Sequence, residues 1–159
     1  MHIYMLCGIA GLPTIDVDDW QRNTAYRQYR ATDPQIVWFW RVVRALEQAE
    51  RALLLKFCTG SSHVPAGGFA TLFGLNGPTR FTIARVQAHT GRAEEGEMAA
   101  ASTSVPAGHR NPEYEKNLLL PTASACFNML KLPSYNRFEL LEEKLLTAVR
   151  HGAEGFAFS

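Results

Sequence analysis

The chain has 159 residues, of which 47% are hydrophobic and 19% charged, and its net charge is +1 at pH 7. This composition suits one ordinary globular domain, and the small net charge gives no signal for nucleic acid or an anionic membrane surface. No apolar run reaches the ~18 residues that span a bilayer. The cysteines, Cys7, Cys58 and Cys126, are odd in number and lack CxxC spacing. They therefore favour free thiols in a reducing compartment, the cytoplasm or nucleus, over a disulfide framework or a zinc site.

The first half of the chain contains signals for helices. An aspartate in the run 16–20 can cap a short helix, and the polar segment 29–35 indicates a linker. From Ile36 the apolar residues recur at helical spacing, which predicts an amphipathic helix. A second helix is expected over 48–57, and Gly60 can supply the positive φ that ends it.

The middle of the chain contains strand and turn signals. Residues 80–84 read as a short strand, preceded by a turn at 76–78. Small and polar residues dominate 88–116, which predicts a disordered insertion. After a loop at 121–125, residues 126–132 alternate well enough for a second strand.

A final helix is predicted from Asn136, with Glu139 reaching back to complete a capping box. Gly152 is expected to end it and to leave a tail that contains Phe156. Spacing alone leaves open whether Phe156 packs back on the domain or meets a partner. The apolar face of this helix consists of Phe138, Leu141, Leu145 and Ala148.

Cys126 lies between a loop and a strand, a position that can present a thiol on a rigid support. Only the thiolate is nucleophilic, free cysteine titrates near ~8.5, and no base adjoins the residue. From spacing alone, a buried structural cysteine therefore remains open. A cysteine–histidine hydrolase is not expected, because His89 and His109 fall in the predicted insertion and a hydrolase needs a fixed base.

Five segments, in order, resemble the C-terminal lobe of HECT-type ubiquitin ligases. LPTASACFN at 120–128 resembles the family's catalytic-cysteine motif, and Phe156 stands fourth from the end, where the family places a phenylalanine needed for transfer. The other matching segments are DVDDW with NTAY at 16–26, IVWFW at 36–40, and LLLKFCTGSSHVP with GGF at 53–69, followed by the strand residues FTI at 81–83.

The resemblance implies an α+β fold with two N-terminal helices, a small β-sheet bearing the cysteine loop, and a C-terminal helix and tail. It implies that residues 1–30 are the end of the N-terminal lobe and residues 36–159 the C-terminal lobe. Between them, at 29–35, it implies a hinge formed by Tyr29, Arg30, Ala31, Thr32 and Asp33.

The resemblance also implies the chemistry. Cys126 would accept ubiquitin as a thioester from a ubiquitin-conjugating enzyme and pass it to a lysine of a protein substrate, without metal or cofactor. The conjugating enzyme would bind mainly through the N-terminal lobe, of which little is expected in this chain. Residues expected to support transfer are Phe156, Phe127, Asn128, Ser124 and Pro121.

Two departures from the family pattern bear on activity. Ser124 and Ala125 stand where the family often has His-Thr, and the 88–116 stretch is longer than in many members. An alternative is therefore a catalytically silent module that binds ubiquitin or another partner.

Overall fold

The computed structural model describes residues 14–88 and 118–156, the last four of them through their backbone only. Its elements in chain order are α2 (Val17–Arg22), β1 (Ala25–Arg27), α3 (Pro34–Ala45), α4 (Gln48–Thr59), η1 (Phe69–Thr71), β2 (Phe73–Gly74), β3 (Gly77–Pro78), β4 (Thr82–Val86), β5 (Thr122–Ser124), η2 (Ala125–Phe127), β6 (Met129–Pro133) and α6 (Phe138–Phe156). Helices and strands do not alternate regularly along the chain, so the predicted α+β class is confirmed.

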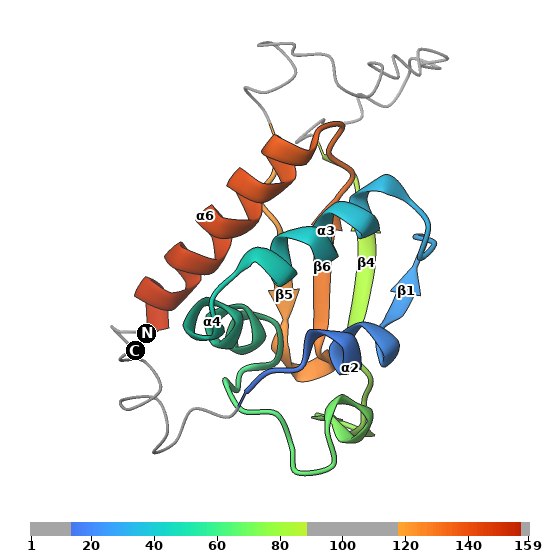
Figure 1. Ribbon diagram of the computed structural model, residues 1–159, viewed down its shortest axis with the longest axis vertical. Coiled ribbons are helices and arrows are strands. Elements are labelled where there is room, and N and C mark those ends of the chain that lie inside the picture. The colour runs from blue at the N-terminus through green and yellow to red at the C-terminus, as the bar shows by residue number, and fades with distance from the viewer. Residues whose placement is uncertain (1–13, 89–117, 157–159) are drawn as a thin grey trace, which may run out of the picture.

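The main sheet has the strand order β1-β4-β6-β5. β1, β4 and β6 run parallel, whereas β5 runs antiparallel to β6. Ile83 and Leu130 are register partners on the two central strands and both are fully buried, while Lys131 is exposed. Figure 1 shows α3 crossing one face of this sheet, with α6 alongside and α4 seen end-on next to β5. The core lies between these helices and the sheet.

The two predicted central helices are confirmed as α3 and α4. α3 begins at Pro34, whose fixed φ suits the first turn of a helix. α4 ends at Gly60, which has a φ of 83°, and the Gly60 N–H donates to the carbonyl of Lys56. Local signals were sufficient here because both boundaries are set by residues with restricted or unusual backbone angles.

A cluster of aromatic rings joins α2 to the rest of the domain. The Trp20 ring is fully buried and stacks on Phe69, with the centroids 5.0 Å apart. It also meets Trp40 and Phe81 edge to face, at 5.9 Å and 5.3 Å. These offset and edge geometries are the favoured ones for aromatic pairs. The cluster therefore ties residues from four separate segments of the chain together.

The segment expected to form a hinge is anchored in the structure. Tyr29 is buried and its hydroxyl donates to the carbonyl of Leu132 at 2.9 Å. The Asp33 carboxylate accepts the Arg30 N–H at 2.8 Å, and β1 pairs with β4 just before this segment. Residues 14–33 thus pack against the rest of the described chain, and the role of 29–35 as a hinge stays a prediction. The division of the chain into two lobes at this point stays a prediction.

The predicted limits of the last helix are both wrong. α6 begins at Phe138, and the side-chain amide of Asn136 makes no hydrogen bond within the described residues, so the expected capping box does not form. Gly152 lies inside α6 instead of ending it. A Cβ at Gly152 would lie 2.8 Å from the Phe57 ring, so the glycine allows α6 to pack closely on α4. The predicted apolar face is confirmed, since Leu141 and Leu145 are fully buried.

The predicted insertion at 88–116 lies outside the described residues except for Ala88. This residue is buried, and its carbonyl accepts the N–H of Leu119 at 2.8 Å. The two points at which the chain leaves and re-enters the described fold are therefore neighbours.

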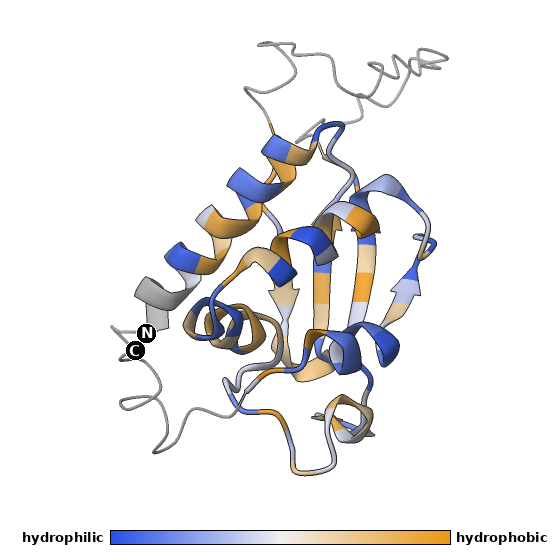
Figure 2. Cartoon of the chain, in the orientation of Figure 1, coloured by the Kyte–Doolittle hydropathy of each residue, from blue (hydrophilic) through white to orange (hydrophobic). Residues whose placement is uncertain are grey.

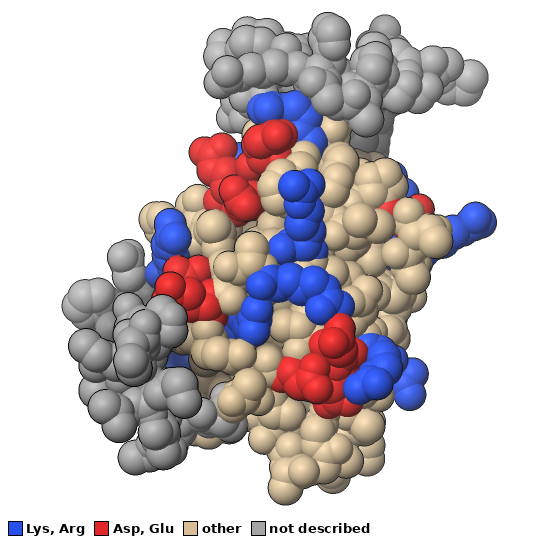
Figure 3. Space-filling model, viewed as in Figure 1, with Lys and Arg blue, Asp and Glu red and all other residues tan. Residues whose placement is uncertain are grey.

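The surface carries both signs of charge in mixture (Figure 3), as expected from the small net charge. One close pair joins Arg44 on α3 to Asp18 on α2 at 2.7 Å. Figure 2 shows the apolar residues of α6 on the side facing the other helices and the polar ones outward. None of the described helices combines the length and the apolar character needed to cross a bilayer.

Replacing Trp20 with alanine should lower the free energy of unfolding by about 3–5 kcal/mol, because it removes a buried ring and leaves a cavity among three others. Denaturant unfolding followed by circular dichroism measures this change. Val37→Ala, at an exposed position of α3, is the matched control and should change stability by less than about 0.5 kcal/mol. Equal effects of the two substitutions would contradict the proposed central role of the Trp20 cluster.

Candidate active site

Cys126 lies in η2, the short turn that connects the antiparallel strands β5 and β6. Its side chain is exposed. The predicted strand at 126–132 therefore begins too early, because β6 starts at Met129, and the predicted loop at 121–125 contains β5. Figure 1 shows this connection at one end of the sheet, where the chain reverses direction. The thiol is thus presented on a tight turn between paired strands.

Asn128 determines the shape of this turn. Its backbone lies in the left-handed region, with φ 49° and ψ 43°, a conformation that asparagine tolerates better than most residues. Its side chain is only 1% exposed, and Nδ2 donates to the carbonyls of Phe73 at 3.0 Å and Thr79 at 2.9 Å. The backbone N–H of Asn128 donates to the Ala125 carbonyl at 3.2 Å. One residue therefore ends η2 and attaches it to the β2–β3 hairpin.

The β2–β3 hairpin also contacts the backbone of the cysteine itself. The N–H of Leu75 donates to the carbonyl of Cys126 at 2.8 Å. A Cβ at Gly74 would lie 2.8 Å from that same carbonyl and 2.6 Å from Thr79 Oγ1. Only glycine fits there without moving the hairpin away from Cys126. A turn is present near the predicted 76–78, but it lies at 75–76, since Gly77 and Pro78 form β3, and its contact with the cysteine was not predicted.

The structure brings together four of the residues expected to act in transfer. Ser124 ends β5 and is half-buried, Cys126 and the 47%-exposed Phe127 follow in η2, and Asn128 closes the turn. Pro121 is buried just before β5. Phe156 is the last residue of α6, and its side chain lies outside the described part. Their roles in transfer stay predictions.

The hinge candidates 29–33 lie away from the thiol. Tyr29 contacts Leu132, near the far end of β6 from Cys126.

The surroundings of Cys126 carry no formal charge along two stretches of sequence. Residues 57–79 and 118–130 contain no Lys, Arg, Asp or Glu. The lower end of the molecule in Figure 3, over the segment that follows α4, accordingly shows only uncharged side chains. The nearest histidine in these stretches, His63, is exposed, and its Nδ1 lies 3.3 Å from the hydroxyl of Ser62. His89 and His109 lie outside the described residues.

Cys58 provides a contrast within the same domain. It is fully buried on α4, and burial raises the pKa of its thiol because the thiolate would lose its hydration. Of the two cysteines that the structure describes, only Cys126 is accessible to another protein.

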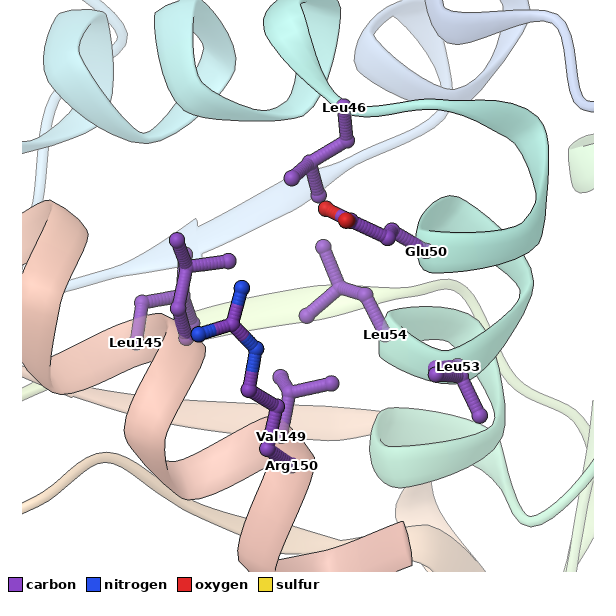
Figure 4. A pocket seen from close by; sticks show the side chains of 8 residues that line it. Leu46, Glu50, Leu53, Leu54, Leu145, Val149 and Arg150 are labelled. Atoms are coloured by element: carbon purple, nitrogen blue, oxygen red, sulfur yellow. The ribbon is translucent and has the colours of Figure 1, made fainter.

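An open hollow of about 450 Å³ is lined by residues 14–18 together with Arg44 and Arg51, and Cys126 is not part of its lining. A groove of about 30 Å³ lies between α4 and α6, which is room for little more than water. Figure 4 shows apolar side chains from both helices converging on it, with Glu50 and Arg150 among its lining. Among the described residues, no group of three His, Cys, Asp or Glu side chains could hold a metal ion.

The amide of Asn128 is expected to hold the cysteine turn. Asn128→Ala removes two hydrogen bonds. It also places alanine, which tolerates the left-handed region less well than asparagine, at a φ of 49°. We therefore expect the free energy of unfolding to fall by about 2–4 kcal/mol. Asn128→Gly should lose less, because glycine adopts this φ freely. Urea unfolding separates the two contributions, and equal losses would show that backbone strain contributes nothing.

The family model described as HECT-domain (ubiquitin-transferase) matches residues 3–159. Curated relatives agree with it. The chain is 41% identical over 151 residues to the E3 ubiquitin-protein ligase ptr1 of Schizosaccharomyces pombe and covers 4% of that protein. It is 43% identical over 152 residues to HACE1 of Mus musculus, of which it covers 14%, and 41% identical over 151 residues to HUWE1 of the same species, of which it covers 3%.

Each of these alignments covers 95% of this chain, so the chain spans only a small part of the length of its relatives. Because the family model matches from residue 3 to the last residue, this chain belongs to the HECT-domain (ubiquitin-transferase) family.

Proposed function

We propose that Cys126 is the acceptor thiol of a ubiquitin transferase. The observation that carries this proposal is the placement of an accessible thiol on a turn that the β2–β3 hairpin holds at two points, through the Asn128 amide and through the N–H of Leu75. A nucleophile that is fixed in orientation and still open to a protein partner suits transfer between macromolecules. The family membership and the ligase names of the relatives support the same reaction.

The proposed reaction has two steps. In the first, the Cys126 thiolate attacks the thioester carbonyl that joins the C-terminal glycine of ubiquitin to a conjugating enzyme. The new C–S bond forms, the old one breaks, and the conjugating enzyme leaves as a thiolate. In the second, the neutral amine of a substrate lysine attacks the Cys126 thioester. An isopeptide bond forms, Cys126 leaves as a thiolate, and the amine proton passes to solvent.

The absence of charged residues in the two stretches around the thiol is compatible with this chemistry. Thioester exchange is nearly isoenergetic, since the bond formed equals the bond broken. Ubiquitin arrives already activated, so correct orientation contributes more than a strong base would. Ser124 and Ala125 supply neither the imidazole nor the threonine hydroxyl that the family often places before the cysteine. We therefore expect slow but measurable transfer.

The proposed partners are ubiquitin, a ubiquitin-conjugating enzyme and protein substrates, with the conjugating enzyme recruited mainly by a HECT N-terminal lobe. The relatives are named as E3 ubiquitin-protein ligases, and this chain aligns with a small part of each. We propose a cytoplasmic or nuclear site of action, consistent with the free cysteines.

The chain is fused to a complete N-terminal lobe and incubated with a ubiquitin-charged conjugating enzyme. A ubiquitin adduct of this fusion protein should appear on a non-reducing gel. Thiol treatment should remove it, and Cys126→Ala should abolish it because the proposed acceptor thiol is removed. Cys58→Ala is the matched control and should load normally. Noncovalent ubiquitin binding without any adduct would favour the silent binding module instead. An adduct that persists in Cys126→Ala would refute the assignment of this residue.

Phe156 is expected to act after loading. Phe156→Ala should leave thioester formation at Cys126 unchanged and slow transfer to lysine about tenfold or more, because only the second step would use this residue. Single-turnover assays with pre-loaded protein separate the two steps. Phe158→Ala, two residues further along, is the control for a general effect of the chain end. Equal losses in both steps would contradict the prediction.

A further inference from the structure

Three apolar side chains around Cys126 are exposed. Phe73 and Leu75, on and beside strand β2, are each 71% exposed, and Phe127 in η2 is 47% exposed. We call these three residues the apolar patch. Leu75 and Phe73 face solvent although their backbone groups bond to the cysteine turn, through the Cys126 carbonyl and the Asn128 amide. The backbone of the hairpin therefore contacts the cysteine turn, whereas the side chains of Phe73 and Leu75 remain exposed.

The two stretches of sequence that include the apolar patch, 57–79 and 118–130, contain no Lys, Arg, Asp or Glu, and Arg80 is the first charged residue after the hairpin. Exposed aromatic and aliphatic side chains on two turns that are joined by hydrogen bonds can form a contact site for another protein. Such a contact would be apolar, so its strength would depend little on the salt concentration.

The transfer reaction restricts which protein can meet this patch. In loading, two cysteine sulfurs must lie within about 3–3.5 Å of one carbonyl carbon. Each sulfur is a single carbon away from its own backbone, so the donor protein must bring its surface against the residues that flank Cys126. A lysine acceptor instead extends its amine on a flexible four-carbon stem of roughly 6 Å, so its protein can remain further away. Loading therefore makes the closer contact.

We propose that Phe73, Leu75 and Phe127 form a docking surface for the charged conjugating enzyme, contacting the residues around its active-site cysteine during loading. This inference rests on the proposed function of Cys126. The patch is continuous with the thiol that the donor must reach, since Phe127 follows Cys126 directly and the N–H of Leu75 binds the Cys126 carbonyl. It is thus a specificity surface for the first step, distinct from the backbone contacts that hold the turn.

The test compares two ubiquitin donors on the full chain fused to a complete HECT N-terminal lobe, so that recruitment of the conjugating enzyme does not limit loading. One is a charged conjugating enzyme, and the other is ubiquitin with its C-terminus joined to mercaptoethanesulfonate, a small thiol that offers no protein surface. Phe73→Ser/Leu75→Ser keeps the backbone groups that bind Asn128 and Cys126. Val37→Ser is the control, because it replaces another exposed apolar residue, on α3. Circular dichroism verifies that each variant is folded.

We expect the double variant to load about tenfold or more slowly from the conjugating enzyme, as for loss of central apolar contacts, and at the wild-type rate from the small thioester. The loading rate from the enzyme should change less than about twofold between low and high salt. Equal loading from the enzyme, or equal losses from both donors, overturns the inference. If the wild type loads from the small thioester but not from the conjugating enzyme, the inference is also overturned. If the wild type loads from neither donor, the proposed function itself is refuted.

Discussion

The two hydrogen bonds from the Asn128 amide to the carbonyls of Phe73 and Thr79 are the contacts on which the geometry of the cysteine turn depends. A buried amide nitrogen has two hydrogens to place, and here both reach the same hairpin. The left-handed backbone of Asn128 lets the chain leave η2 and enter β6 directly, so Cys126 is held close to a paired strand. Its accessible thiol is thereby supported by a segment some fifty residues earlier in the chain, at separations of 55 and 49 residues.

Local signals predicted those parts of the fold in which a single residue restricts the backbone. Pro34 and Gly60 mark the start of α3 and the end of α4, as expected from their allowed φ values. The prediction that Gly152 ends the last helix was wrong because this glycine serves a tertiary contact. It makes room for Phe57 of α4 and lies within α6. The three-residue strands β1 and β5 could not be predicted, since so few residues show no periodicity and their pairing partners are distant.

The sequence pointed to Cys126 as the candidate residue, a role that stays a prediction, but it did not reveal the contacts that hold its turn. The resemblance of residues 120–128 to a family motif pointed to Cys126, whereas its chemistry alone left a buried structural role open. Nothing local distinguishes Cys126 from Cys58, and only packing shows that one is exposed and the other enclosed. Phe73 is a similar case, because its sequence neighbours do not show that its side chain is exposed. The anchoring of Tyr29 likewise depends on a hydrogen bond to Leu132, 103 residues away.

The hydrogen bond between the Ala88 carbonyl and the Leu119 N–H has a consequence for how this domain can vary. This bond holds the two ends of the segment between them side by side. The entropy of closing a flexible loop grows only with the logarithm of its length, by about 0.6 kcal/mol for each doubling. Because Ala88 and Leu119 are already in contact, residues can be added or removed between them without moving either end of the described fold.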